Sequence, residues 1–453
     1  MARPTSLLKI LGLSFGLAVT VGNTIGGGIL RTPGDIAGWL PQTWAFVGIW
    51  LVGALYATLG ANALSELGTM LPRSGGQYVF ARHAFGEYAG FLVGWIDWIS
   101  TCASTAIIAM VIGESVASLF GLDASTSKPV AMAIVVALTL LLLRSTRLGD
   151  RAQQITTLVK ALALTALMIA CFAFSGRAHV SAVATAATAA TAATAATAAA
   201  SPAGFVAFLL ALQAVIYTYD GWSGPIYFSE ELHDPARQIP RSMFYSLASV
   251  AAIYVLINVA FVVTLPTRAL AGSPLAAGTV ANALFGVRGE QFVRVVVIAS
   301  LPSAVSACIL MASRVLYSVS RDGLGPAVAT RVNGGGAPMV SLALTGLVSV
   351  AFVATKTVTT IVAVAAFFFV ADYTLSFAAV FVLRRREPEA ARPYRAVGHP
   401  WSTGVVLLGS LAFLASAVVA DARNSVFALI VVVVSYPVFR FSRPPGVPAP
   451  SVS

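Results

Sequence analysis

About twelve apolar runs, each long enough to cross a lipid bilayer, constrain this chain more than any other feature. A membrane-spanning helix needs about 20 apolar residues and satisfies its backbone hydrogen bonds internally. The runs lie near residues 8–30, 42–68, 86–118, 128–146, 152–175, 203–230, 241–265, 290–318, 338–355, 357–383, 402–420 and 425–441. Only 10% of the residues are charged, against about a quarter in a soluble domain. The sequence therefore predicts an all-α integral membrane protein with about 12 transmembrane helices.

The basic residues give the orientation of these helices. Nineteen of the 28 Lys and Arg residues fall on one side, eight fall on the other, and Lys160 lies within a run. Because cytoplasmic loops are enriched in Lys and Arg, we expect a multi-pass protein of the cell membrane with both termini in the cytoplasm. The first run is expected to remain as a helix, since no cleavage site for a signal peptide follows it. The net charge of +11 follows this topology, so no nucleic-acid partner is predicted.

The first run contains an unusual amount of glycine for a membrane helix. In "GNTIGGGIL", glycine occupies Gly22, Gly26, Gly27 and Gly28, and each weakens a helix interior by roughly 1 kcal/mol relative to alanine. Irregular backbone at this depth is tolerated only where it lines a cavity or is buried in protein. The sequence therefore predicts a break in helix one.

The sixth run is interrupted as well. It carries the segment "YDGWSGP", residues 219–225, which places an acid, two glycines and a proline in an apolar context. Helices one and six are five spans apart, the separation expected for two five-helix repeats of inverted topology. Interrupted segments in corresponding positions are the best sequence indication of a transporter's substrate site.

Broken helices expose backbone groups that suit a zwitterion. The bare N–H groups of Gly26, Gly27 and Gly28, together with the helix dipole, favour a carboxylate. The freed carbonyls near Asn23, Thr24, Tyr217 and Tyr219 can accept bonds from an ammonium group, so an α-amino acid fits. In the alternative, the glycines only allow close helix packing.

Five motifs make a family resemblance visible. They are "GNTIGGGIL", "ALSELGTMLPRSGGQYVFARHAFG" (63–86), "YDGWSGPIYFSEELHDPARQIPRS", "SRDGLGPAV" (320–328) and "RPYRAVGHPW" (392–401). The chain resembles the amino acid–polyamine–organocation superfamily, close to its bacterial amino acid permeases and exchangers. The resemblance covers nearly the whole chain except the Ala/Thr linker and the tail. It implies a five-plus-five inverted-repeat (LeuT-like) fold, with the amino acid held between broken helices one and six.

The resemblance also implies a domain plan and a set of site residues. The plan is a single transporter domain, 1–453, with a first repeat at about 8–176, a low-complexity external linker at 181–202, a second repeat at about 203–384, and helices eleven and twelve at about 402–441. The predicted substrate-binding residues are Asn23, Thr24, Ile25, Gly26, Gly27, Gly28, Tyr217, Tyr219, Asp220, Gly221 and Trp222. Gly27 stands where the family usually has Ser or Thr, so a hydroxyl group that would touch the substrate carboxylate is missing.

Three of the residues within the spans have two readings each. Lys160 matches a lysine that sits beside helix one in proton-coupled relatives; it either releases its proton during coupling or acts as a fixed cation on freed carbonyls. Asp220 either caps the second half of helix six or contacts substrate. Trp222 resembles the aromatic residue that covers bound substrate in relatives, or it is a packing indole.

Other charged groups have weaker patterns. We expect Asp97, Glu114 and Asp372 to lie on cavity or inter-helix faces, paired, because isolated charges in a membrane are costly. A further set near the cytoplasmic helix ends is expected to form gate ion pairs or plain interface charges. This set comprises Glu66, Arg73, Glu230, Glu231, Arg237 and Arg321.

The remaining function classes fit less well. No HExxH or GxSxG motif is present, and no catalytic residue, metal or cofactor is predicted. The cysteines Cys102, Cys171 and Cys308 are interpreted as packing residues. The predicted function is secondary active transport of amino acids by alternating access, with protons as a coupling ion and the bilayer as surroundings. The alternatives are a polyamine or cationic-compound permease and an amino acid exchanger.

Overall fold

The computed structural model describes residues 12–144, 146–177, 204–333, 337–355, 358–420 and 422–442. Within these ranges the regular elements are helices, apart from one isolated bridge between Val332 and Pro338. Nine of the described helices are long and apolar enough to cross a membrane. The prediction of an all-α membrane protein is therefore confirmed.

The elements follow one another as the apolar runs predict. Before the Ala/Thr linker come α1 (Leu13–Thr24), α2 (Gly28–Trp39), α3 (Thr43–Met70), α4 (Gln77–Phe85), α5 (Glu87–Leu119), the 3₁₀ turn η1 (Ala124–Thr126), α6 (Ser127–Arg144), α7 (Thr146–Phe174) and η2 (Ser175–Arg177). After it come α9 (Phe205–Tyr219), the 3₁₀ helix η3 (Gly224–Glu231), α10 (Pro235–Thr264), α11 (Thr267–Leu270), α12 (Ala276–Phe285), α13 (Val287–Arg321), η4 (Ala327–Thr330), α14 (Met339–Thr355), α15 (Val358–Arg386), α16 (Trp401–Ala420) and α17 (Ala422–Ser442).

Three predicted runs fall below the length needed for an unbroken span. The first run is divided into α1 and α2, and the apolar parts of α14 and α17 are short. The first run was also expected to end near residue 30, and this boundary is wrong: α2 continues to Trp39. The polar residues Arg31 and Asp35 end the apolar run but not the helix.

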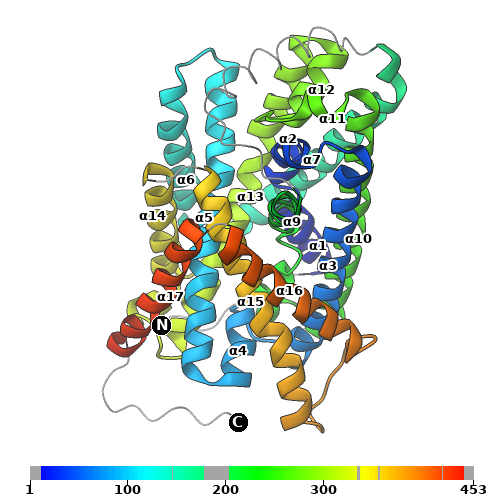
Figure 1. Cartoon of the computed structure of the whole chain (residues 1–453). Coiled ribbons are helices and arrows are strands. Elements are labelled where there is room, and N and C mark those ends of the chain that lie inside the picture. The colour runs from blue at the N-terminus through cyan, green and yellow to red at the C-terminus, as the bar shows by residue number, and fades with distance from the viewer. Residues whose placement is uncertain are drawn as a thin grey trace.

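The broken helices lie at the centre of the bundle. Figure 1 shows α1, α2 and α9 in the middle, with α5 and α13 on one side and α3 and α10 on the other. The contacts agree, because α1 packs on α10 and α7, and α9 packs on α2 and α3. Small residues permit this close packing: a Cβ at Gly53 of α3 would lie 2.3 Å from Val215 of α9.

The described residues cover only part of the predicted domain plan. The linker predicted at 181–202 lies outside the described residues. The repeat boundaries at about 8–176 and 203–384 stay predictions. Two short helices that the apolar runs do not predict, α4 and α12, each pack on the long helix that follows, α5 and α13 respectively.

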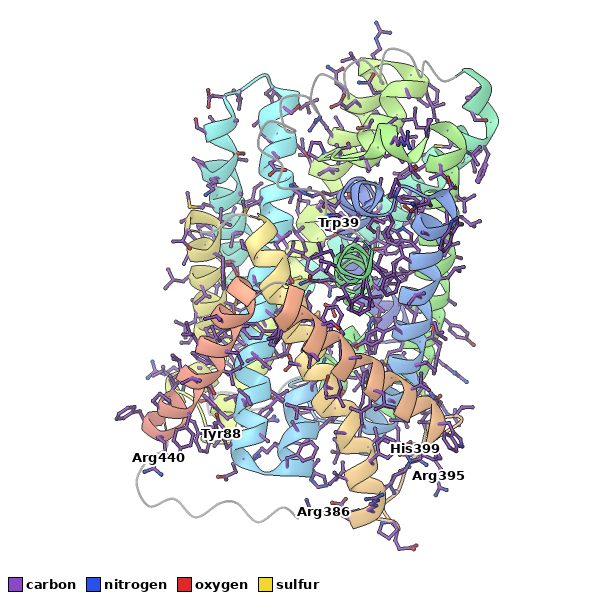
Figure 2. The ribbon with its side chains drawn as sticks, viewed as in Figure 1. Trp39, Tyr88, Arg386, Arg395, His399 and Arg440 are labelled. Carbon is purple, nitrogen blue, oxygen red and sulfur yellow. The ribbon has the colours of Figure 1, made fainter. Side chains whose placement is uncertain are left out.

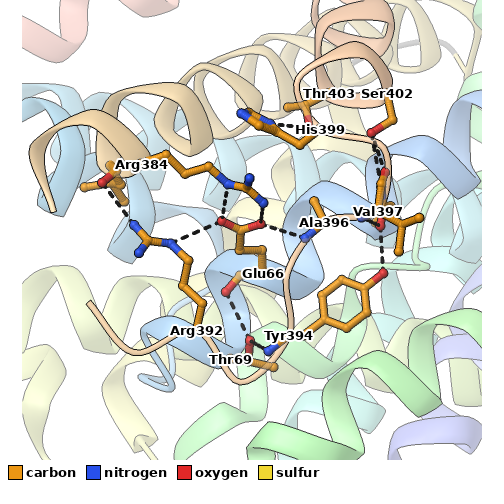
Figure 3. Close-up of polar contacts among 12 residues, drawn as sticks. Glu66, Thr69, Arg384, Arg392, Tyr394, Ala396, Val397, His399, Ser402 and Thr403 are labelled. Carbon is orange, nitrogen blue, oxygen red and sulfur yellow. Dashed lines mark hydrogen bonds and ion pairs between the residues drawn. The ribbon is translucent and has the colours of Figure 1, made fainter. Parts of the chain in front are cut away.

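A buried acid fastens the loop between α15 and α16 to α3. Glu66 is 1% exposed and accepts hydrogen bonds from Arg384 Nε (2.8 Å) and the backbone N–H of Ala396 (2.7 Å). Arg392 Nε lies 3.3 Å from the same carboxylate. Figure 3 shows these groups converging on Glu66 from α15 and from the loop that follows it. One turn earlier, Asn62 accepts bonds from Tyr394 Oη (2.7 Å) and Val397 N (2.9 Å).

Candidate substrate site

The break in the first span leaves a helix N-terminus without a cap. After α1 ends at Thr24, Gly26 N donates back to Thr24 O (2.7 Å). The N-cap of α2 is Gly27, and no side chain caps it. The first N–H groups of a helix have no acceptor within that helix. The start of α2 therefore carries free donors and the positive end of the helix dipole.

The break in the sixth span touches the first one. Gly221 has a φ of +108°, a left-handed conformation that glycine adopts without strain. A Cβ at Gly221 would lie 2.8 Å from Asn23 Nδ2 and 2.9 Å from Thr24 N. Only glycine lets the two interrupted backbones approach this closely, so the pairing of the two breaks is confirmed.

A small cavity, with about 40 Å³ open to the centres of water molecules, lies at this junction. Seven of the predicted site residues line it: Asn23, Thr24, Gly26, Gly27, Gly28, Tyr217 and Asp220. Four others, Ile25, Tyr219, Gly221 and Trp222, are not part of the lining. Gathering the seven in one cavity brings the helix-one donors and the helix-six acid together.

Trp222 packs away from the cavity. Its ring is stacked on Tyr373, with centroids 4.9 Å apart, and is 2% exposed. A Cβ at Gly60 would lie 2.9 Å from the same indole. Tyr219 similarly packs against Trp50 and Tyr254. In this conformation Trp222 is therefore a packing residue and does not line the cavity.

Two of the carbonyls expected to receive an ammonium group already have partners. Thr24 O accepts from Tyr254 Oη (2.5 Å) as well as from Gly26 N. Tyr217 O accepts from Asp220 N (3.2 Å). The interrupted helices recover some of their own hydrogen bonds, so the amine end of a substrate has fewer free acceptors than the sequence suggests.

Asp220 lines the cavity and does not cap a helix. Its Oδ1 accepts a short hydrogen bond from Tyr373 Oη. The N-cap of η3 is Ser223, so the cap that the sequence allowed for Asp220 is not formed. A carboxylate held by one tyrosine and facing the cavity remains able to accept a bond from a ligand.

Sequence reasoning missed the α5 and α13 walls of the cavity. These walls contribute Thr101, Ser104, Ile107, Ile108, Cys308 and Met311. Cys308, interpreted from sequence as a packing residue, donates to Asn23 Oδ1 at 3.1 Å. A signal for α5 was present: "STCAST", residues 100–105, is a run of small polar residues inside an apolar helix. No comparable sequence signal marks α13.

Lys160 lies beside α1, as the resemblance implied. It is 3% exposed, and its Nζ donates to Gly22 O at 2.7 Å. In an unbroken helix this carbonyl would accept from the N–H of residue 26, but Gly26 N donates to Thr24 O. Lys160 therefore takes the place of a backbone donor that the break removed. Its role in coupling stays a prediction.

Two of the three acids expected to be paired do have partners. Glu114 pairs with Arg31 at 2.9 Å, and Asp97 accepts from Tyr227 Oη at 3.0 Å. The expectation is wrong for Asp372, whose two carboxyl oxygens have no hydrogen-bond partner among the described residues.

Ion pairs join η3 to the C-terminal part of α13. Arg314 binds Glu231 through Nε (3.1 Å) and Nη2 (3.2 Å), and Arg321 binds Glu230 through two bonds of 2.9 Å. Nearby, Asp322 Oδ2 forms an ion pair with Arg82 Nη1 at 2.6 Å. The second half of span six is thus fastened to α13, as the gate interpretation expects. Of the predicted gate residues, Arg73 also contacts Asp322, whereas Arg237 only approaches Asp234 within its own helix turn.

Comparison with known proteins agrees with this architecture. The family model described as "Amino acid permease" matches residues 6–436. The serine/threonine exchanger SteT of Bacillus subtilis (strain 168) is 25% identical over 96% of both chains. The large neutral amino acids transporter small subunit 2 of Oryctolagus cuniculus is 29% identical, over 86% of this chain and 72% of its own.

A third relative aligns with this chain over a smaller share of its own length. The b(0,+)-type amino acid transporter 1 of Mus musculus is 28% identical over 71% of this chain and 64% of its own. The family match extends over both broken helices and almost all of the described bundle. The chain belongs to the amino acid permease family of the amino acid–polyamine–organocation superfamily.

Proposed function

We propose that this protein carries α-amino acids across the cell membrane by alternating access, with exchange of one amino acid for another as its main mode. The observation that carries the proposal is the uncapped N-terminus of α2, which opens into a cavity at the junction of two broken helices. The substrate carboxylate binds the free N–H groups at Gly27 and Gly28. The relatives' names, which include an exchanger, support exchange.

The rest of the lining favours a neutral side chain. Ile107, Ile108 and Phe369 supply apolar surface, and Thr101 and Ser104 supply hydroxyl groups. Such a wall accommodates small hydroxyl or apolar side chains without burying an unpaired charge. Relatives named for serine and threonine and for large neutral amino acids fit this chemistry.

The polyamine alternative has less support. A polyamine needs an acid for each amine and offers no carboxylate to the N-terminus of α2. Asp220 is the one carboxyl group in the described lining of the cavity, and Tyr373 already donates to it. The donor-rich end of the site would then face a cation, which the helix dipole disfavours.

Alternating access requires the η3–α13 ion pairs to separate. At the end of α13 that carries them, Asp322 binds Arg82 of α4, and Ala84 of α4 accepts a hydrogen bond from Arg386. Figure 2 labels Arg386, Arg395 and Arg440 along the lower end of the molecule. Because cytoplasmic segments are enriched in Lys and Arg, we propose that this end faces the cytoplasm and that both termini lie there. We propose that the structure has its cytoplasmic path closed and that opening this path breaks the bonds of Glu230 and Glu231 to α13. Reporter proteins that are active on only one side of the membrane, fused to either terminus, test the orientation.

The mode of transport is tested with purified protein in liposomes. Vesicles loaded with serine are mixed with radiolabelled serine, alanine, leucine, arginine or putrescine, and empty vesicles serve as the control. We expect uptake of the neutral amino acids and faster uptake into loaded vesicles. Uptake of putrescine alone contradicts the proposal, and equal uptake into empty and loaded vesicles contradicts exchange.

We further propose that Lys160 couples transport to the movement of protons.

A further inference from the structure

Two buried carboxyl groups lie on α5 and α15, helices that pack against each other, and neither group is part of the lining of the substrate cavity. Asp97 belongs to α5 and Asp372 to α15, and each is 0% exposed. Their neighbours in sequence, Ile96 and Ala371, belong to the same apolar cluster. The charges that act most on Asp372 are those of Asp97 and Asp220.

Neither carboxyl group has a cation to balance it in the part of the chain that the structure describes. Among the described residues, Asp97 and Asp372 form no ion pair. Two ionised carboxylates close together in a dry interior repel each other, and each loses its hydration. An arrangement of this kind holds at least one proton, as acid dyads elsewhere do.

The hydrogen bonds decide which oxygen carries that proton. Asp97 Oδ1 accepts from Tyr227 Oη at 3.0 Å and from Thr101 Oγ1 at 3.4 Å, which stabilises the ionised form. Among the described residues, no donor reaches either oxygen of Asp372 or the Oδ2 atom of Asp97. An orphaned buried carboxyl group is least costly when neutral. We infer that Asp372 holds a proton beside an ionised Asp97, and that this acid pair is a proton site coupled to the substrate cavity.

Tyr227 makes the connection to the substrate. It lies in η3, lines the cavity and donates to Asp97. The three acids Asp97, Asp220 and Asp372 all act on its hydroxyl group. Asp220 faces the cavity and is held by Tyr373, the residue after Asp372 on α15. Movement of η3 during the transport cycle withdraws the Tyr227 donor from Asp97. This withdrawal changes how tightly the pair of acids holds its proton.

This inference rests on the proposed transport function for its role, so its first test does not use transport. Infrared spectroscopy of purified protein detects the C=O stretch of a protonated carboxyl group, which shifts in heavy water. We expect wild type to show this band at neutral pH and Asp372→Asn to lack it. The exposed Asp123, in the turn before η1, provides a matched control, and Asp123→Asn should keep the band.

Two further variants separate the alternatives. Asp372→Glu should restore the band, because it restores an acid at the same position. Asp97→Asn removes the neighbouring negative charge, so the band should persist and disappear at a lower pH than in wild type. A band unchanged in Asp372→Asn overturns the assignment, and so does a band lost only in Asp97→Asn.

Transport then tests the coupling. Serine uptake by wild type with no substrate inside should fall as pH rises, by up to about tenfold per pH unit, the slope for one required proton. Asp372→Asn should reduce this dependence to the part that Lys160 contributes, and Asp123→Asn should keep it in full. If uptake follows a sodium gradient and ignores pH, the pair binds Na⁺ and the proton inference is wrong. If no amino acid is transported while the infrared results hold, the proton site stands and the proposed function fails.

Discussion

Lys160 donates from Nζ to the carbonyl oxygen of Gly22 at 2.7 Å, and so joins α7 to the last turn of α1 just before the break. Gly26, whose N–H would serve this carbonyl in a continuous helix, bonds to Thr24 O instead. The lysine thus restores a hydrogen bond that the interrupted backbone gave up. If Lys160 lost its proton, the hydrogen bond that holds the end of α1 would lose its positive charge.

This contact gives the first prediction. Lys160→Ala should abolish uphill uptake driven by an inward proton gradient, while exchange at equal pH survives because the helix-one donors remain. Lys160→Arg should also fail to accumulate substrate, since arginine does not release its proton in a working range. The measurement is gradient-driven uptake of labelled serine into liposomes.

Thr157, about one turn earlier on α7, supplies the control. Its Oγ1 donates to Ala18 O at 3.3 Å, so Thr157→Val removes a contact between the same helices without touching a charge. It should accumulate substrate like wild type. Accumulation by Lys160→Arg at the wild-type level would show that Lys160 is a fixed cation.

The start of α2 gives the second prediction. A Cβ at Gly28 would lie 2.9 Å from Thr218 Oγ1, so Gly28→Ala pushes the donor end of α2 away from α9. We expect KM for serine to rise by about tenfold, equivalent to about 1.4 kcal/mol, with protein yield unchanged. Gly38→Ala lies in the same helix with nothing within 4 Å and should leave KM unaltered. Equal KM values for the two variants would contradict the placement of the carboxylate.

The third prediction concerns the stacked pair Trp222 and Tyr373. Because the indole is 2% exposed and fills the space beside Gly60, Trp222→Ala should destabilise the fold by about 3–5 kcal/mol. The melting temperature in detergent should fall along with transport. Trp44→Ala, at a position 79% exposed, is the control. A variant that keeps its melting temperature but loses transport would instead favour a substrate lid.

The fourth prediction concerns the closed cytoplasmic path. The Arg314–Glu231 pair has side chains only 4% and 8% exposed, and removing one partner of a buried pair costs about 3–5 kcal/mol. Glu231→Gln should therefore shift the protein toward the conformation open to the cytoplasm. A cysteine placed beside η3 should then react faster with a reagent added from that side.

An exposed pair nearby provides the comparison for this experiment. Arg237 and Asp234 lie 3.8 Å apart with side chains 76% and 48% exposed, and surface pairs contribute about 0–1 kcal/mol. Asp234→Asn keeps a good N-cap residue for α10 and should label at the wild-type rate. The gate assignment fails if both variants label alike.

The sequence predicted the helices and the breaks because their signals are local. An apolar run or a cluster such as Gly26, Gly27 and Gly28 can be read without knowing its neighbours. Pairing needs tertiary structure: nothing local shows that Trp222 stacks on Tyr373, or that Cys308 of α13 reaches Asn23. The end of α2 was misplaced for a related reason, since Arg31 lowers hydropathy while its partner Glu114 lies in another helix.

The anchoring of Glu66 has a consequence for how the chain is made. Glu66 emerges from the ribosome 318 residues before Arg384, with Arg392 and Ala396 later still. Until then α3 resides in the membrane with an acid whose final partners do not yet exist. Chains that stop before Arg384 therefore keep a buried acid without its cationic partners in their second span. Completion of the loop adds Arg392 and Ala396, the last of the partners that hold Glu66 and, with it, α3.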